Sequence, residues 1–283
     1  MSLLHYRRVV ETCRPFVLAT DLIVEDLDLA PLGVSIPPES RRNPQHRRHQ
    51  TFVDLIRQLD ELTFGPVGMP MPQWVFYDCA VMPGAVFGFA QPASTLEPWV
   101  RHCLKVPKDY DGDVPLSTFI AIPMLVPDTW LTYSLCDVNQ VAPGAAPEGL
   151  QQLTMILGLA MFRARNLYGT TQWRASKLRV LSQLGPLDVI TAYTPAHSMP
   201  RTLTFHTAIT DDGTAAVLAG ADTSPSSPLA THLLDVDDEA MLRRLQLEVE
   251  AGVRWRIVGP PLIRGAATQV PLRREDARGG ASW

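Results

Sequence analysis

Residues 129–166 read TWLTYSLCDVNQVAPGAAPEGLQQLTMILGLAMFRARN, and this stretch decides the fold that the sequence predicts. Residues 129–137 are rich in β-branched and aromatic side chains, which is typical of a strand. Residues 142–149 contain two prolines and two glycines, which predicts a loop. Residues 150–166 are apolar on nearly every side, so we expect a helix that is buried on more than one face.

The segments before this stretch predict one amphipathic helix and several strands. Residues 51–62 place apolar side chains at helical spacing, with Asp60 among the polar residues of the opposite side. Residues 73–81 and 86–90 predict a β-hairpin around a turn at 82–85. Residues 117–126 predict a further strand. The sheet therefore has at least four strands once residues 129–137 are included.

The segments after residue 166 predict shorter elements, then a separate C-terminal region. We expect strands at 170–173, 187–193, 202–207 and 253–258, helices at 176–184 and 238–251, a turn at 211–213 and a linker at 222–228. The fold class is α+β, with a mainly antiparallel or mixed central sheet around one buried helix. The predicted organisation is an N-terminal extension at 1–50, a core domain at 51–220, and a linker, helix and tail at 221–283.

Composition excludes several classes of protein. The formal net charge of −4 is unlike that of a protein whose whole surface binds nucleic acid. The longest apolar run, 116–126, is too short for a membrane span and contains Pro123. Four widely spaced cysteines show no zinc-ligand spacing, so we expect no metal. These patterns predict a cytoplasmic protein without a nucleic-acid or membrane partner.

The order of elements resembles the GNAT superfamily of acyl-CoA-dependent N-acyltransferases over roughly residues 50–210. In that family a central strand leads into a loop, and backbone N–H groups at the start of the next helix bind the pyrophosphate of coenzyme A. The resemblance implies an acyl-CoA cosubstrate, transfer to a small amine and no metal. It places the cofactor-binding positions at Val138, Gly144, Ala145, Ala146 and Gly149.

Two motifs carry the resemblance, and both depart from the family pattern. Residues 140–146, QVAPGAA, are similar to the family's Q-x-x-G-x-G/A, but the segment is one residue longer and Pro143 interrupts it. The loop contains no arginine or lysine. Residues 180–186, VLSQLGP, are similar to L-Y-x-x-x-G-F, with Leu181 where the family has a tyrosine acid.

Polar groups on the predicted core strands are the candidates for catalysis, because amine attack on a thioester needs proton transfer. They are Tyr77, Asp78, Tyr133 and Asp137. His197, in the polar turn 194–198 after a strand, is the remaining candidate. The tyrosines and Asp137 also have a structural interpretation: the tyrosines as residues at the edge of the core, and Asp137 as a cap for backbone N–H groups.

Two other functions remain open from the sequence. One is a non-catalytic accessory or interaction protein of a biosynthetic pathway, forming a homodimer and presenting the charged helix 238–251. The other is a small-molecule-binding antiparallel β-barrel, with a pocket walled by Phe76, Phe87, Phe89 and Trp130.

Overall fold

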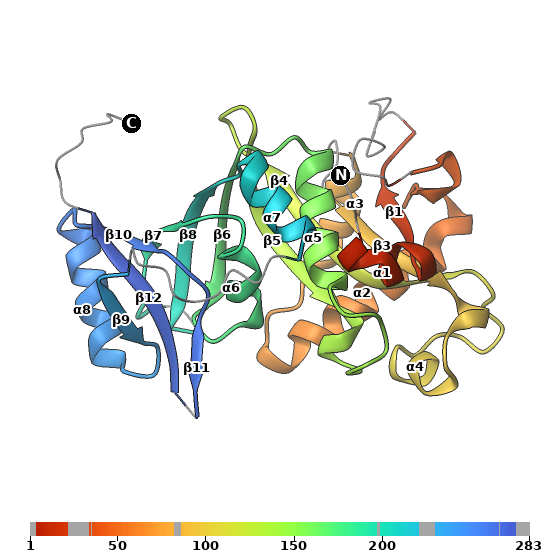
Figure 1. Cartoon of the computed structure of the whole chain (residues 1–283). Helices are drawn as coiled ribbons and strands as arrows, with labels where there is room; N and C mark the ends of the chain where they lie inside the picture. The colour runs from red at the N-terminus through yellow and green to blue at the C-terminus, as the bar shows by residue number, and fades with distance from the viewer. Residues whose placement is uncertain are drawn as a thin grey trace. The chain divides into compact units, whose positions relative to one another are not determined.

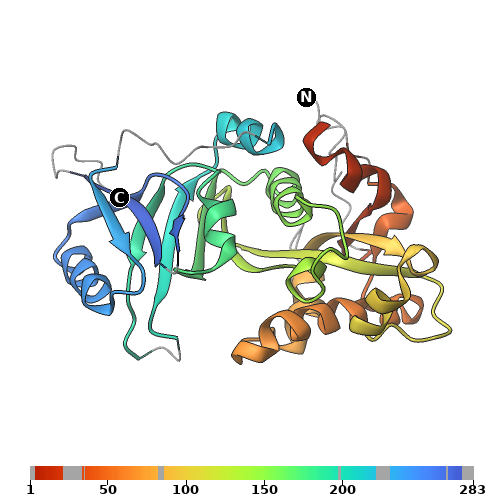
Figure 2. The ribbon, with the colours of Figure 1, turned by 60° about the horizontal axis from the view of Figure 1, so that its bottom comes forward.

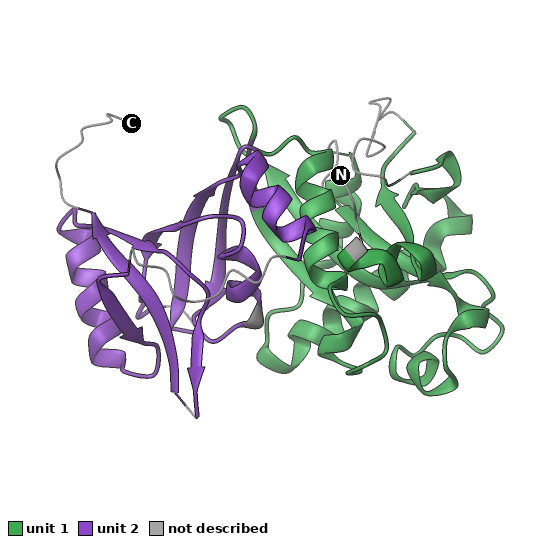
Figure 3. Cartoon of the chain, in the orientation of Figure 1, with its two compact units in different colours: residues 1–128, 132–164 green, residues 129–131, 165–283 purple. Residues whose placement is uncertain are grey.

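The computed structural model describes residues 4–21, 34, 36–81, 86–196, 199–220, 230–265 and 267–275 (Figure 1). It confirms the α+β fold class with a mixed sheet. The chain forms two compact units (Figure 3): unit 1 contains residues 1–128 and 132–164, and unit 2 contains residues 129–131 and 165–283. No helix among the described residues is both long and apolar enough to cross a membrane.

The sheet of unit 1 runs in the order β2-β1-β3-β4-β5. β1 pairs with β2 in parallel and with β3 antiparallel, and β3 pairs with β4 antiparallel. The predicted strand at 129–137 is confirmed as β5. The strands are β1 (Arg14–Leu18), β2 (Arg41–Arg42), β3 (Val86–Pro92), β4 (Asp113–Pro123) and β5 (Thr129–Asp137).

Helices cover both faces of this sheet. Figure 2 shows α5 and α2 on opposite sides of β4. Gly158 lets α5 approach Phe119 of β4, and Thr154 is hydrogen-bonded to Ser117 of β4 at 2.6 Å. The helices of unit 1 are α1 (Arg7–Thr12), α2 (Gln50–Phe64), α3 (Gln73–Val81), α4 (Pro98–Cys103) and α5 (Leu150–Met161), with 3-10 turns η1 (Leu4–Tyr6), η3 (Pro38–Ser40), η4 (Arg47–His49), η5 (Gly65–Val67), η6 (Ala93–Thr95) and η7 (Val138–Gln140).

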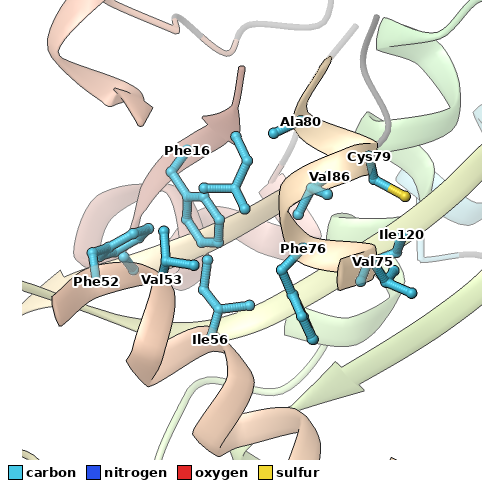
Figure 4. Packing of buried hydrophobic residues seen from close by; sticks show 12 residues of the cluster. Phe16, Phe52, Val53, Ile56, Val75, Phe76, Cys79, Ala80, Val86 and Ile120 are labelled. Carbon is cyan, nitrogen blue, oxygen red and sulfur yellow. The ribbon is translucent and has the colours of Figure 1, made fainter. Parts of the chain in front are cut away.

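A cluster of apolar side chains fills the space between α2, α3 and the sheet (Figure 4). The rings of Phe16 and Phe52 meet edge to face, with centroids 4.8 Å apart. Ile56, Phe76 and Ile120 are almost completely buried around them. Full burial of each such side chain contributes about 1.5–3 kcal/mol, so this layer fixes α2 and α3 on the sheet.

The predicted strand at 73–81 is wrong, because these residues form α3. Residues 86–92 are a strand as predicted, while the predicted turn at 82–85 lies outside the described residues. A nearly continuous apolar run has neither a helical nor a strand period, so periodicity does not separate the two. The buried residues Val75, Phe76, Cys79 and Ala80 lie on one helical face, which packing against the apolar cluster selects.

Unit 2 has a sheet in the order β6-β8-β7-β10-β12-β11, with β9 also paired to β12. Residues 211–213 begin α7 rather than a turn, because the hydroxyl of Thr210 accepts the N–H of Gly213 as a helix cap. The elements are β6 (Asn166–Gln172), α6 (Ser176–Leu181), β7 (Leu187–Thr191), β8 (Thr202–Ala208), α7 (Asp211–Leu218), β9 (His232–Asp235), α8 (Glu239–Glu250), β10 (Arg254–Ile257), β11 (Leu262–Arg264) and β12 (Ala267–Glu275). The predicted linker at 222–228 lies outside the described residues.

The described strands of neither unit close on themselves, which excludes the β-barrel alternative. Phe76, Phe87 and Phe89 are fully buried core residues, and Trp130 is also buried. These four aromatic side chains therefore pack inside the protein rather than lining a barrel.

Candidate functional site

The strand β5 ends in a capped turn at Asp137. The Asp137 carboxylate accepts the backbone N–H of Gln140 at 3.2 Å, and the Gln140 side-chain oxygen accepts the N–H of Asp137 at 2.9 Å. This reciprocal pair starts η7 at the last residue of the strand. Burial raises the pKa of Asp137, while hydrogen bonds from the N–H groups of Asn139 and Gln140 act in the opposite direction. Asp137 thus sets the direction in which the loop leaves the sheet.

The loop between η7 and α5 is closed by the side chain of Asn139. Its amide oxygen accepts the N–H of Ala146 at 3.0 Å, and its amide nitrogen donates to the carbonyl of Ala146 at 3.2 Å. Inside this closure, the N–H of Ala145 donates to the carbonyl of Ala142 at 3.0 Å. Pro143 and Gly144 are the central residues of that turn, and Gly144 has a φ of 83°, as a type II turn requires. Pro143 therefore shapes the loop.

The helix α5 begins directly after Gly149, which has a φ of 82°. Glycine has no side-chain oxygen with which to cap the first N–H groups of the helix. A Cβ atom at position 149 would lie 2.7 Å from the ring of Tyr6. Both the backbone conformation and the close approach of Tyr6 therefore require glycine here, and the helix presents its first N–H groups without a cap from this residue.

Gln151, in the first turn of α5, adds a buried donor to this region. Its side chain is only 7% exposed, and its amide nitrogen has no hydrogen-bond partner among the described residues. A buried donor without an acceptor costs about 1–3 kcal/mol.

The charge of the loop differs from that of a strongly basic phosphate site. Asp137 and Glu148 are its charged residues, and residues 138–149 contain no lysine or arginine. An anion bound here would therefore interact with backbone N–H groups and the positive end of α5. Among the described residues, no group of three or more histidine, cysteine, aspartate or glutamate side chains is arranged to hold a metal ion.

The predicted catalytic residues fall on two faces of the unit 1 sheet. Side chains alternate along β5, so Tyr133 and Asp137 share one face and Ser134 occupies the other. The Ser134 hydroxyl donates to Asp60 of α2 at 3.2 Å, which places Tyr133 and Asp137 on the face away from α2.

Tyr77 and Asp78 belong to α3, on the α2 side of the sheet. The Tyr77 hydroxyl accepts a hydrogen bond from Gln50 of α2 at 2.8 Å, and Asp78 is exposed on the helix. The sheet therefore separates these two residues from Tyr133 and Asp137. His197 lies outside the described residues.

Sequence reasoning missed three polar residues that shape this region. Asn139 and Gln151 lay unremarked in the predicted loop and helix, although a glutamine in an apolar helix is a signal of a buried polar contact. Asp60 was predicted on the polar side of its helix and is instead 2% exposed, which is a correction. It accepts hydrogen bonds from Ser134 and from the N–H of Met71 at 2.6 Å.

The two left-handed glycines of the loop provide a matched pair of substitutions. Gly144→Ala places its Cβ in open space, so we expect a loss of about 1–2 kcal/mol from the positive φ alone. Gly149→Ala adds the clash with Tyr6 and should lose about 1–3 kcal/mol more. Urea unfolding of both variants measures the difference. Equal losses would contradict a close contact between Tyr6 and the start of α5.

Known proteins were compared with the chain at the level of sequence and of structure. No protein-family model matches the sequence, and no curated protein matches it. Solved acetyltransferase structures do match. The ribosomal-protein-S18-alanine N-acetyltransferase from Escherichia coli is 12% identical, with a TM-score of 0.37, covering 56% of this chain and 88% of that chain.

Two further solved structures match the chain with similarly low sequence identity and TM-score. The aminoglycoside 6'-N-acetyltransferase from Enterococcus faecium is 12% identical, with a TM-score of 0.35, covering 58% of this chain and 94% of its own. A GNAT-family acetyltransferase from Bacillus anthracis is 11% identical, with a TM-score of 0.34, covering 58% of this chain and 89% of its own. The chain thus has a weak, partial resemblance to GNAT acetyltransferases.

Proposed function

We propose that this chain is an acyl-CoA-dependent acyltransferase that transfers an acyl group to a small amine. The loop 138–149 and the first turn of α5 would bind the pyrophosphate of the acyl-CoA. The observation that carries the proposal is the buried Gln151 amide, which has no acceptor among the described residues and lies in the helix turn that follows Gly149. The sequence resemblance of this strand, loop and helix to the GNAT superfamily supports the same assignment.

The geometry of the loop suits a pyrophosphate for a physical reason. Phosphate oxygens accept hydrogen bonds from N–H groups, and the start of a helix adds a positive dipole. The Asn139 bridge and the turn at Pro143 and Gly144 hold the loop in one conformation, so little conformational entropy is lost when a ligand binds. Backbone and amide donors therefore take the role that arginine or lysine would have.

The reaction requires one proton transfer from the attacking amine and one to the departing thiolate. The amine nitrogen forms a bond to the acyl carbon, the carbon–sulfur bond breaks, the amine loses a proton and the thiolate gains one. We assign Tyr133 to this proton transfer, because it lies on the same face of β5 as Asp137 and is more than a third exposed. Asp137 already accepts N–H groups of its own loop, so we assign it to positioning that loop.

Binding of the cosubstrate is tested by thermal unfolding with acetyl-CoA and longer acyl-CoAs. A ligand at 100 times its Kd should stabilise the chain by about 2.7 kcal/mol. Gln151→Met should weaken binding about tenfold, equivalent to about 1.4 kcal/mol. Gln152→Met, at the neighbouring partly exposed position, is the matched control and should bind as the original chain does.

A stabilising shift that is unchanged in Gln151→Met would contradict the assigned pyrophosphate site. Absence of any shift with every acyl-CoA would overturn the proposed cosubstrate. Release of free thiol from acetyl-CoA in the presence of small amines then tests turnover. Loss of this activity in Tyr133→Phe, with the thermal shift retained, would support a role for Tyr133 after binding.

A non-catalytic function remains the second candidate, because one position of the motif is incompatible with acid chemistry. Leu181, which stands where the GNAT pattern has tyrosine, is completely buried in α6. An acyl-CoA-dependent thermal shift without thiol release would favour this alternative. The cytoplasmic location and homodimer predicted from the sequence remain proposals, and light scattering tests the dimer.

A further inference from the structure

A cavity of about 670 Å³ lies at another part of unit 1, where β1 begins, β3 ends and β4 begins. Its walls come from β1, β2, η4, α2, η6 and the segment 110–113. None of the residues singled out for the proposed acyltransferase function lines it. The side chains with chemistry of interest in this cavity are Arg14, Arg42, Arg48, His49, Asp111 and Asp113.

Arg42 is held in place as part of the cavity wall. Its guanidinium donates to the Asp113 carboxylate at 2.5 Å, and both side chains are mostly buried. The same guanidinium lies over the ring of Phe52, 5.2 Å from the ring centroid. Ion pairing and the aromatic contact together restrict Arg42 to one orientation. The Arg42–Asp113 pair is therefore a rigid and nearly neutral part of the wall.

Arg14 and Arg48 are the other two guanidinium groups of the cavity. Arg14 forms an ion pair with Asp113 at 3.7 Å, which is longer than a hydrogen bond, and the Arg14 side chain is largely exposed, so its remaining N–H groups can reach a ligand. Arg48 is exposed and forms no ion pair with any residue that the structure describes. Asp111 is the opposing carboxylate, and it is exposed to solvent. With Asp113 neutralised by Arg42, the remaining charges give the cavity a net positive charge.

His49 is a buried imidazole in the wall of the cavity. Its Nδ1 lies 2.9 Å from the backbone nitrogen and 3.1 Å from the carbonyl oxygen of Asn43, so Asn43 holds the ring in place. Burial lowers the pKa of His49, and the charges of Arg42 and Arg48 act in the same direction. A hydrogen bond with the backbone of Asn43 acts in the opposite direction on this pKa, and the net effect favours the neutral imidazole.

We propose that this cavity binds the phosphate group of a small molecule, with Arg14 and Arg48 as donors. Two guanidinium forks match the several acceptor oxygens and the double charge of a phosphate monoester. A carboxylate, by comparison, is satisfied by a single guanidinium fork. Phe52 and Tyr110 line the rest of the cavity and offer apolar surface to the body of the ligand.

Titration with inorganic phosphate at constant ionic strength tests the site, with thermal unfolding as the measurement. The original chain should show a saturable rise in Tm. Arg48→Gln and Arg14→Gln should each weaken the apparent affinity about tenfold or more. Arg47→Gln is the matched control, because Arg47 precedes Arg48 in the same turn, is exposed and does not line the cavity. It removes the same charge and should leave the affinity unchanged.

Phosphate binding in this cavity must also be distinguished from phosphate binding at the start of α5. In the Gln151→Met chain the phosphate response should persist, while the response to acetyl-CoA should weaken. Phosphate affinity that falls equally in Arg47→Gln and Arg48→Gln would show unspecific charge screening and overturn the proposal. Absence of a saturable response up to roughly 50 mM phosphate would also overturn it. Either outcome leaves the acyl-CoA experiment unaffected, so the two proposals fail independently.

Discussion

Replacing Gly88 by alanine should lower the free energy of unfolding by about 3 kcal/mol or more. Gly88 lies in β3 between β1 and β4, and a Cβ atom there would be 2.1 Å from the Ser117 carbonyl oxygen and 2.6 Å from the Phe16 ring. The Ser117 oxygen is backbone and cannot turn away as a side chain can. Relief therefore requires β3 and β4 to separate, at the position just before the register shift between Phe89 and Ala90.

Gly65→Ala is the control for this experiment. Gly65 has a right-handed helical conformation, and its added Cβ would approach only the flexible, exposed Glu61 side chain. We expect stability that is unchanged or raised by up to about 1 kcal/mol, because alanine restricts the unfolded chain. Urea unfolding of both variants measures the contrast. A loss below about 1 kcal/mol for Gly88→Ala would mean that β3 and β4 pack less closely than the structure shows.

The buried Asp60 should make stability fall as the pH rises from about 4 to 7. Burial raises the pKa of Asp60 from 3.8 to about 6, although Met71 and Ser134 donate hydrogen bonds to it. The folded chain therefore binds more protons than the unfolded chain between these two pKa values. A shift of this size corresponds to about 3 kcal/mol that is present below pH 4 and lost as the pH rises through 6.

Asp60→Asn should remove this part of the pH dependence. The asparagine side chain still accepts from the N–H of Met71 and can exchange a hydrogen bond with Ser134, but it carries no charge to bury. Above pH 7 the variant should be more stable than the original chain by up to about 3 kcal/mol, with the two converging near pH 4. Denaturant unfolding at several pH values measures this difference.

Asp54→Asn, on the exposed side of α2, is the control for the pH experiment. It should leave the profile unchanged, because the Asp54 side chain is about half exposed. If the free energies of unfolding of the original chain and of Asp60→Asn differ by the same amount at every pH, the raised pKa of the buried Asp60 carboxylate would be contradicted. Asp60 also joins α2 to β5 through its hydrogen bond with Ser134. The same experiment therefore tests a contact that holds α2 against the strand leading into the candidate site.

The local residue pattern was sufficient to predict those helices and strands whose tertiary contacts favour the same conformation as their own residues do. The strand 129–137, the start of α5 at Leu150, and helices α2 and α8 lie where periodicity and turn residues predict them. The turn at Pro143 and Gly144 follows from the restricted φ of proline and the tolerance of glycine for positive φ. In these segments the preferred local conformation is also the one that buries the apolar side chains.

Long-range contacts decided the rest. Residues 73–81 form α3 because one helical face packs against Phe16 and α2, a choice that their own apolar run does not express. The burial of Asp60 depends on Ser134, 74 residues away in the sequence. Likewise, the separation of Tyr77 and Asp78 from Tyr133 and Asp137 depends on which helix covers which face of the sheet.

The sequence by itself determined the α+β class, the strand at 129–137, the loop, the start of the following helix at Leu150, and the resemblance that this order carries. It predicted that this helix runs to residue 166, whereas α5 ends at Met161. Those features arise from hydrophobic period, proline and glycine geometry, and charge, all of which act between near neighbours. Only the tertiary structure decided that Asn139 closes the loop, that the Gln151 amide is buried without an acceptor among the described residues, and that Arg14 and Arg48 line one cavity. The physical reason is that burial and hydrogen bonding depend on partners distant in the chain, which local residue pattern does not encode.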